Sequence, residues 1–568
     1  MSKSKDMISE DTIKKFLDGT DPQQYIVAIE GNYHSNTVEL VINPPEGKKY
    51  IESQTYKPFL WFKHEVSEVI YGGKRHKILE ACAKHGVKIT KLKINNEGEL
   101  PPERLSDGFM YMAKCSKSYN DLINFFKFGG VDVFGQERAI DSGLDNKVFF
   151  TMFSPVEQFM IQTGKRLFKG FEDYDELHRF QFDLETEGLY ANRHEIFQIG
   201  MRDNDGNHSI LETIGDTPQE RRDSERRNIE TFFAAIDMLE PDIVTGYNSE
   251  NFDWAFIFER CKRLNINIES IAKTLSPSHK IKRKKSPIKL GGKSEFFDQT
   301  LLYGINVIDI SHAVRRAMAI NSEIKSWGLK YITKYSEVAS KNRVYVPGDK
   351  IRTTWADKVN SYAFNNENGD WYKISERNPL KEEYVVTTGA EIVKKYLMDD
   401  LIETDEIDKI FNQASFLIGK ILPTTFQRSS TMGTAGQWKL IMAAWSYENG
   451  LALPSLQTKR DFTGGLSRLL RVGFSKNFVK LDFAALYPKT ELTWDIFPEL
   501  DITGVMKGML TYIVNTRDKF KNLTSYEKDI VKKLKKELED KTLTPEERKK
   551  KEEEINDHKK LQNKYDKK

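Results

Sequence analysis

The chain has 568 residues, of which 39% are hydrophobic and 30% are charged. This composition is typical of a soluble globular protein and excludes collagen-like, disulfide-rich and wholly disordered chains. At about 100 to 200 residues per domain, we expect three to five compact units. The 87 Lys and Arg side chains nearly balance the 84 Asp and Glu, which leaves a net charge of only +3. Any nucleic-acid surface must therefore come from a local cluster of basic residues.

Cysteine content and hydropathy predict the compartment. Cys82, Cys115 and Cys261 are too few for a disulfide framework and too far apart in the sequence for a zinc pattern. The chain has no run of about 18 apolar residues, and its first residues lack the apolar stretch of a signal peptide. We therefore expect a cytoplasmic protein with no membrane partner.

The first part of the chain is rich in predicted strands. Between residues 24 and 62, short β-branched and aromatic runs alternate with Gly, Pro and Asn turns. This pattern predicts a β-rich domain over residues 1–175. From residue 176 to about 411, strand-like runs alternate with helical ones, which is typical of an α/β layer fold. The expected fold class is α/β for that domain and α+β overall.

The first candidate site residues lie on a predicted strand. In residues 179–185 the apolar side chains alternate strictly, so a strand would bury Phe180, Phe182 and Leu184 on one face. Asp183 and Glu185 would then project together from the other face. Two such carboxylates repel each other unless cations neutralise them, which makes them a candidate site for a hard metal ion. A solvated surface pair is the alternative.

Two later acids are also candidates. Asp253 follows a predicted strand and would lie in the first turn of a helix. The alternative to a metal ligand is an ordinary helix N-terminus, where the helix dipole stabilises an acid. Residues 389–411 have helical periodicity, and Tyr396 and Asp400 share a face. An acid on that inward face is unusual for a packing helix, whereas the neighbouring Asp399 is expected to face solvent.

Two further segments have a strong compositional bias. Residues 279–293 contain seven Lys or Arg and no acid. This stretch is either a contact for DNA phosphates or a solvated, flexible loop. The cations that we expect at the phosphates are Lys282, Arg283, Lys284 and Lys285. After Arg517 the sequence is rich in Lys and Glu, and Thr544, Pro545 and Glu547 have the spacing of a helix capping box. This pattern predicts a hairpin of two polar helices.

Together, the acid-bearing segments resemble the three exonuclease motifs of family B DNA polymerases. Residues 182–186 read FDLET, residues 246–253 read GYNSENFD and residues 396–400 read YLMDD. The resemblance implies a ribonuclease H-like fold over residues 176–411. It also implies 3′→5′ proofreading activity on single-stranded 3′ ends of DNA.

The resemblance further implies a role for each acid. Two Mg²⁺ or Mn²⁺ ions would lie about 3.5 to 4 Å apart, with Asp183 bridging them. Glu185 and Asp400 would complete the shell of one ion, and Asp253 would serve the other. The Tyr396 hydroxyl would orient the attacking water. In the second motif, contacts to the frayed 3′ end are expected from Asn248 and Phe252.

A second group of motifs resembles the polymerase part of the same family. Residues 462–465 read FTGG, in which Gly464 and Gly465 would let the backbone approach the template strand, unless they form a simple turn. Residues 480–488 read KLDFAALYP and are similar to the first palm motif. The resemblance implies that Asp482 binds the catalytic Mg²⁺.

Nucleotide contacts follow from the same resemblance. The backbone N–H groups around Leu486 would meet the triphosphate, and Tyr487 would exclude a 2′-hydroxyl. The family pattern has Ser where this sequence has Ala485 and Lys489, so a polar triphosphate contact is lost or replaced. The two finger residues expected to grip the incoming nucleotide are Arg517 and Lys521.

The 568 residues contain neither the K-x-x-x-N-S-x-Y-G finger motif nor the D-T-D-S palm motif, and no thumb is recognisable. Residues 412–510 would be a linker and partial palm, and residues 511–568 partial helical-hairpin fingers. We therefore expect the N-terminal subunit or a fragment of a replicative polymerase similar to those of T-even-like and other large bacteriophages, located in the host cytoplasm. The expected partners are primer–template DNA, deoxynucleoside triphosphates, a sliding clamp and a C-terminal polypeptide that carries the missing motifs.

Two other functions remain open from the sequence. One is a free-standing exonuclease with a decayed palm. The other is a non-catalytic subunit for single-stranded DNA binding or assembly. Primer extension with a C-terminal polypeptide would distinguish all three.

Overall fold

The computed structural model describes residues 8–63, 68–71, 74–77, 86–94, 107–126, 148–271, 281–455, 468, 472–474, 476, 479, 483–538 and 544–567. The chain forms two compact units, each built from separated segments. Unit 1 comprises Met1–Thr20, Lys57–Phe153 and Ala443–Lys568, and unit 2 comprises Asp21–Tyr56 and Ser154–Met442. The domain boundaries expected at residues 175, 411 and 510 stay predictions.

A five-stranded mixed sheet forms the centre of unit 2, in the order β13-β12-β11-β14-β17. The first three strands in this order pair antiparallel, and β14 and β17 continue parallel to β11. The strands are β11 (Arg179–Thr186), β12 (Ile196–Asp203), β13 (His208–Glu212), β14 (Ile243–Gly246) and β17 (Asn306–Asp309). The α/β pattern predicted for this part of the chain is confirmed.

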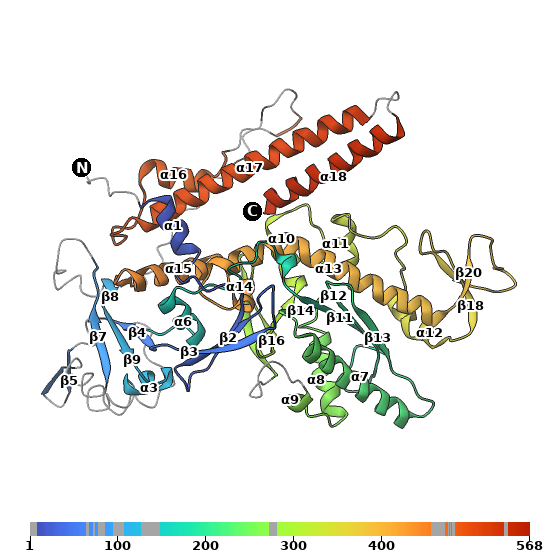
Figure 1. The fold of residues 1–568 in the computed structure, drawn as a ribbon, viewed down its shortest axis with the longest axis horizontal. Coiled ribbons are helices and arrows are strands. Elements are labelled where there is room, and N and C mark those ends of the chain that lie inside the picture. Colours follow the sequence, from blue (N-terminus) through green and yellow to red (C-terminus); the bar gives the residue numbers. More distant parts are fainter. Residues whose placement is uncertain are drawn as a thin grey trace. The chain divides into compact units, whose positions relative to one another are not determined.

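Helices cover both faces of this sheet (Figure 1). On one face, the alternating apolar side chains of β11 pack against α7 (Pro218–Leu239) and α8 (Asp253–Arg263). The ring centres of Phe182 and Trp254, for example, lie 5.0 Å apart. The other face is covered by α13 (Gly389–Ile421), a helix of 33 residues. This second face is where the acids of β11 point.

The early strands of the chain belong to the same unit as this sheet. Strands β1 (Ile26–Gly31), β2 (Thr37–Ile42) and β3 (Tyr50–Thr55) form an antiparallel sheet, as expected from their alternating runs. Their buried side chains share one core with Ile243 of β14 and Ile308 of β17. The packing therefore joins the first strands to the five-stranded sheet.

The remaining elements of unit 2 surround these sheets. They are α6 (Pro155–Thr163), η4 (Tyr174–Glu176), α9 (Ile268–Ile271), β15 (Lys282–Leu290), β16 (Lys293–Leu301), α10 (Ile310–Ile320), α11 (Leu329–Tyr335), η5 (Gly348–Lys350), α12 (Ile351–Ala356), β18 (Asn360–Phe364), β19 (Trp371–Lys373), β20 (Val385–Thr388) and α14 (Phe426–Thr431). Helix α15 (Thr434–Glu448) follows.

The basic stretch forms regular structure rather than a flexible loop. Strands β15 and β16 pair antiparallel from Lys282↔Leu301 to Leu290↔Lys293. Gly291 at the turn has a φ of +60°, a conformation that favours glycine. Residues 272–280, which include the start of the basic stretch, lie outside the described residues.

Unit 1 combines short strands with long C-terminal helices. Its elements are α1 (Glu10–Leu17), β4 (Phe59–Phe62), β5 (Glu68–Tyr71), β6 (Lys74–Lys77), β7 (Val87–Lys91), β8 (Gly108–Phe109), β9 (Tyr111–Cys115), α3 (Tyr119–Asn124), β10 (Phe149–Phe150), β21 (Leu453–Pro454), α16 (Leu486–Trp494), α17 (Val505–Leu538) and α18 (Pro545–Lys567). One sheet has the order β10-β4-β9-β7.

The predicted helical hairpin is present as α17 and α18, although it starts at Val505 and not near residue 511. The predicted capping box also forms: the Glu547 N–H donates to Thr544 Oγ1 at 3.3 Å, and the Thr544 N–H donates to the Glu547 carboxylate at 2.9 Å. Among the described residues, no helix combines the length and hydropathy needed to cross a bilayer.

Candidate functional site

Asp183 and Glu185 leave β11 on the face that α13 covers. Two earlier side chains on this face, Arg179 and Gln181, donate to the buried Asp405 of α13 at 2.9 and 3.1 Å. Because side chains alternate along a strand, the two acids point in the same direction as these donors. The predicted orientation of β11 is therefore the observed one.

A close approach between α13 and β12 brings a third acid to this position. A Cβ atom on Gly200 would lie only 2.9 Å from Cγ of Leu397, so glycine on β12 lets the helix pack against the sheet. One carboxylate oxygen each from Asp183, Glu185 and Asp400 then lies within 4.8 Å of the others. The structure thus brings Asp400 to two acids that precede it by more than 200 positions in the sequence.

Asp253 is the first residue of α8 and is only 3% exposed. The loop before it is held by Asp309, whose carboxylate accepts backbone N–H groups of Asn248 at 2.9 Å and Glu250 at 3.1 Å. Oδ1 of Asp253 is buried and has no hydrogen-bond partner among the described residues. A buried oxygen without a donor is costly and favours a cation beside it.

The acids strongly influence one another. Burial raises the pKa of Asp183 to about 6, although Lys330, the Leu184 N–H and Arg343 act to lower it. Burial and the charge of Asp183 raise the pKa of Glu185 well above its ordinary value. Burial and the same charge, together with Asp309, raise the pKa of Asp253. Ionising all of these acids together is therefore unfavourable unless cations compensate their charge.

Two cations that were not predicted from the sequence form ion pairs with Asp400. Both Lys330, from α11, and Arg343 form ion pairs with its carboxylate. Burial, and next the charge of Arg343, lower the pKa of Lys330 to about 7. Because these cations come from a helix and a loop far from Asp400 in the sequence, no local motif reveals them.

The surroundings of Asp399 differ from the expectation. That side chain was expected to face solvent, but it is 7% exposed and accepts the Val344 N–H at 2.9 Å. Arg343 lies 3.7 Å from the same carboxylate and forms an ion pair with Glu403 at 2.9 Å. Asp399 is buried because this guanidinium and backbone N–H compensate its charge.

Tyr396 lies one turn before Asp400 and is partly buried. The Lys330 ammonium lies 4.6 Å from the centre of its ring. Burial and the negative charges of Glu185 and Asp183 raise the pKa of its hydroxyl. The hydroxyl is therefore protonated at neutral pH and is a hydrogen-bond donor beside the acids.

The donor set fits hard divalent cations. The ligand atoms that converge from Asp183, Glu185 and Asp400 are carboxylate oxygens, which is the ligand chemistry that Mg²⁺ and Mn²⁺ prefer. The unpartnered oxygen of Asp253 and the raised pKa values are consistent with a site that cations stabilise. At Asp400, such an ion would compete with Lys330 and Arg343.

The predicted DNA contacts have different surroundings. Asn248 has a φ of +61° and receives a hydrogen bond from the Asn251 side chain, while the Phe252 ring lies 5.5 Å from that of Phe256. On β15, three of the predicted basic residues are exposed: Lys282, Lys284 and Lys285.

Arg283 does not fit the predicted phosphate contact. Its side chain is 16% exposed and donates to the backbone carbonyls of Glu250 and Asp298. These contacts with residues outside β15 hold Arg283 partly buried, while Lys282, Lys284 and Lys285 face solvent.

The residues predicted for nucleotide transfer belong to unit 1. Asp482, Gly464 and Gly465 lie outside the described residues. Leu486 and Tyr487 form the first turn of α16 and are 49% and 80% exposed. Arg517 and Lys521 are exposed on α17. No described contact brings these side chains together.

Comparisons with known proteins show a similarity that includes the acid-bearing sheet of unit 2. Residues 158–332 match a family model described as DNA polymerase family B, exonuclease domain. The chain is 24% identical over 399 residues to a DNA polymerase of Pyrococcus glycovorans, covering 64% of this chain and 45% of that protein. It is 23% identical over 414 residues to DNA polymerase 1 of Pyrococcus abyssi, covering 66% and 47%. The chain thus spans about half the length of these curated relatives.

Among solved structures, a family B DNA polymerase from the archaeon Pyrobaculum calidifontis is similar, with a TM-score of 0.56 and 14% identity over 95% of this chain and 67% of that one. The similar proteins named here are archaeal, so the expected likeness to T-even-like bacteriophage polymerases is not supported. The first two acid-bearing motifs lie inside the matched residues, and the third lies beyond them. Residues 158–332 are therefore similar to the exonuclease domain of family B DNA polymerases.

Proposed function

We propose that this chain removes nucleotides from the 3′ ends of single-stranded DNA, using two Mg²⁺ or Mn²⁺ ions. The observation that carries the proposal is the convergence of Asp183, Glu185 and Asp400, with the buried Asp253 interacting electrostatically with Asp183. A solvated surface pair, the alternative for the first two acids, does not fit their burial or their raised pKa values.

In this proposal each residue has one role. Asp183 would hold both ions, Glu185 and Asp400 would hold one of them, and Asp253 would hold the other. When bound, two such ions stabilise the attacking and leaving oxygens of an in-line displacement at phosphorus. The neutral Tyr396 hydroxyl donates to or accepts from the attacking water and orients it.

An open cavity next to the acids supports a single-stranded substrate. Its volume is about 520 Å³, and its lining includes Lys334, Lys341, Arg343, Tyr345 and Trp371. Aromatic faces and cations are the groups that bind bases and phosphates of single strands without sequence preference. Because Arg343 lines the cavity and also pairs with Asp400, the cavity adjoins the acid cluster.

Further contacts in the proposal come from unit 2. Asn248 and Phe252 would contact the 3′-terminal nucleotide, and Lys282, Lys284 and Lys285 of the β15–β16 hairpin would contact phosphates. Arg283 is left out of this set because its donors bind backbone carbonyls.

We also propose a role for unit 1 in DNA synthesis. Asp482 would bind one catalytic ion, Leu486 and Tyr487 would contact the nucleotide, and Arg517 and Lys521 would grip its triphosphate. Two-metal transfer needs a second metal-binding aspartate, which these 568 residues do not supply in a recognisable motif. The proposal therefore includes a polypeptide that supplies it, with primer–template DNA, deoxynucleoside triphosphates and a sliding clamp as further partners.

The exonuclease proposal is tested with a 5′-labelled single-stranded oligonucleotide. We expect stepwise shortening from the 3′ end in Mg²⁺ or Mn²⁺, and none with a chelator. Asp183→Ala should slow cleavage by at least about a thousandfold, because two bound ions supply several kcal/mol of transition-state stabilisation. Asp223→Ala, at an exposed acid of α7, is the matched control. Undiminished cleavage by Asp183→Ala would refute the assignment.

A further inference from the structure

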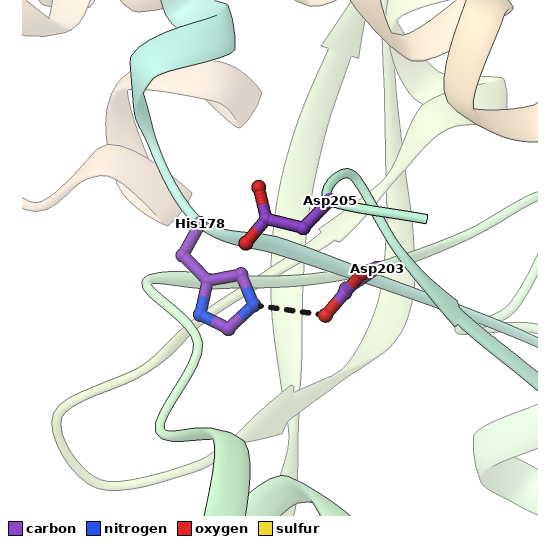
Figure 2. Close-up of side chains that lie close together, drawn as sticks. All are labelled: His178, Asp203 and Asp205. Carbon is purple, nitrogen blue, oxygen red and sulfur yellow. Dashed lines mark hydrogen bonds and ion pairs between the residues drawn. The ribbon is translucent and has the colours of Figure 1, made fainter. Parts of the chain in front are cut away.

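A second cluster of metal-ligating groups lies at the opposite end of β11 from Asp183 and Glu185. His178 directly precedes β11, Asp203 ends β12, and Asp205 lies in the turn that leads to β13. Because β11 and β12 are antiparallel, with Phe180 opposite Asp203, these ends meet. Figure 2 shows the three side chains pointing toward one another. One ligand atom from each lies within 4.8 Å of the other two.

The strand ends hold two of these groups in place. Asp203 is 1% exposed, and its carboxylate accepts the Asn207 N–H at 2.9 Å and the Asn207 side-chain amide at 2.8 Å. The backbone N–H of His178 donates to the buried carboxylate of Asp242 at 3.0 Å. Hydrogen bonds of this kind fix the direction of a metal ligand before the ion arrives.

A long hydrogen bond joins His178 and Asp203, and the separation between their ligand atoms also fits a metal ion held between them. His178 Nε2 lies 3.4 Å from Asp203 Oδ2, whereas good N–H···O bonds measure about 2.7 to 3.2 Å. Two ligands that each lie about 2.0 Å from a tetrahedral zinc ion are about 3.3 Å apart.

We propose that His178 Nε2, the Asp203 carboxylate and the Asp205 carboxylate bind one divalent first-row transition-metal ion, with Zn²⁺ preferred. An imidazole ligand suits Zn²⁺, Co²⁺ and Ni²⁺, whereas Mg²⁺ prefers oxygen ligands alone. Three protein ligands leave at least one position for water. The ion joins the start of β11 to the β12–β13 turn, and this site does not depend on the proposed nuclease function.

Zinc binding to the full chain tests the proposal. Isothermal titration is carried out in an Asp183→Asn background with excess Mg²⁺, so that the all-carboxylate site contributes little to the signal. We expect one zinc equivalent, with an affinity that falls at least about tenfold in His178→Ala, because the only nitrogen ligand is lost. The matched control is His208→Ala, at an exposed histidine of the neighbouring strand β13, which should bind zinc normally.

A second variant keeps the result independent of folding defects. Asp205 is exposed, so Asp205→Asn should fold normally and still lose affinity for zinc. Zinc should also raise the unfolding temperature of the background protein but not that of His178→Ala, since a ligand that binds only the folded state stabilises it. Equal zinc affinity in the background protein and in His178→Ala, or no zinc binding by the folded chain, would overturn the proposal.

Discussion

The acids on β11 and the nucleotide-contact residues on α16 and α17 were both expected from short motifs, but their surroundings differ. Asp183 is half-buried, Glu185 is buried, and α13 brings Asp400 to them. Tyr487 is 80% exposed, and Arg517 is exposed on α17. Burial and convergence therefore support the nuclease assignment, whereas the polymerase assignment still depends on the motif alone. When the groups of a site come from distant segments, its chemistry can be recognised only from the folded structure that brings them together.

The largest expected effect concerns the polymerase motif. Templated primer extension by this chain should be undetectable alone and should appear when a polypeptide carrying the D-T-D-S motif is added, because the second aspartate then completes a two-metal site. Asp482→Ala should abolish synthesis by the mixture while leaving 3′-end cleavage unchanged. Synthesis by the isolated chain, or by the mixture containing Asp482→Ala, would contradict this half of the proposal.

A smaller but still large effect is expected at Asp253. Asp253→Ala should slow 3′-end cleavage by roughly a thousandfold, because removing the ligand of one ion loses several kcal/mol of transition-state stabilisation. Tyr487→Ala, in the exposed region, should leave the cleavage rate unchanged. The measurement is single-turnover cleavage of a 3′-terminal nucleotide at saturating enzyme. Equal effects of the two substitutions would remove the distinction between the two regions.

The burial of Asp183 predicts a pH-dependent stability. Its pKa rises from 3.8 to about 6 on folding, so the folded state binds the proton more tightly than the unfolded state does. The contribution of this group to stability is full below about pH 3.8 and is lost as the pH rises through about 6. Asp183→Asn cannot ionise, so its free energy of unfolding relative to wild type should rise across this window by up to about 3 kcal/mol, at about 1.4 kcal/mol per pKa unit.

This pH effect is measured by denaturant unfolding with a chelator present. Asp223→Asn, at an exposed position on α7, serves as the control and should show no comparable change across the same window. A difference between Asp183→Asn and wild type that stays constant from pH 4 to pH 7 would mean that Asp183 is not buried among acids.

The smallest effect is expected at the β15–β16 hairpin. Replacing Lys282, Lys284 and Lys285 with Gln should lower the salt slope of single-stranded DNA binding by about 2, since each lost phosphate contact removes about 0.7. Arg283→Gln should leave the slope unchanged and lower the thermal stability, because its guanidinium binds backbone carbonyls. Identical salt slopes for the triple variant and wild type would mean that the hairpin does not contact phosphates.

The strand and helix patterns could be read from the sequence because they depend on local alternation and capping. The face of β11 that carries its acids and the capping box at Thr544 are examples. The burial of Asp399 and the inward turn of Arg283 could not be read, because each depends on partners supplied by distant segments. Lys330 was missed for the same reason, since its ion pair with Asp400 exists only after α11 and α13 pack.

The central claim is that the four acids of unit 2 hold two divalent ions. Diffraction from crystals soaked with Mn²⁺ tests this claim most directly, because anomalous scattering locates each ion. We predict two peaks about 3.5 to 4 Å apart, both beside Asp183, with Glu185 and Asp400 at one and Asp253 at the other. Absence of anomalous signal at these carboxylates in crystals that show bound Mn²⁺ elsewhere would contradict the account.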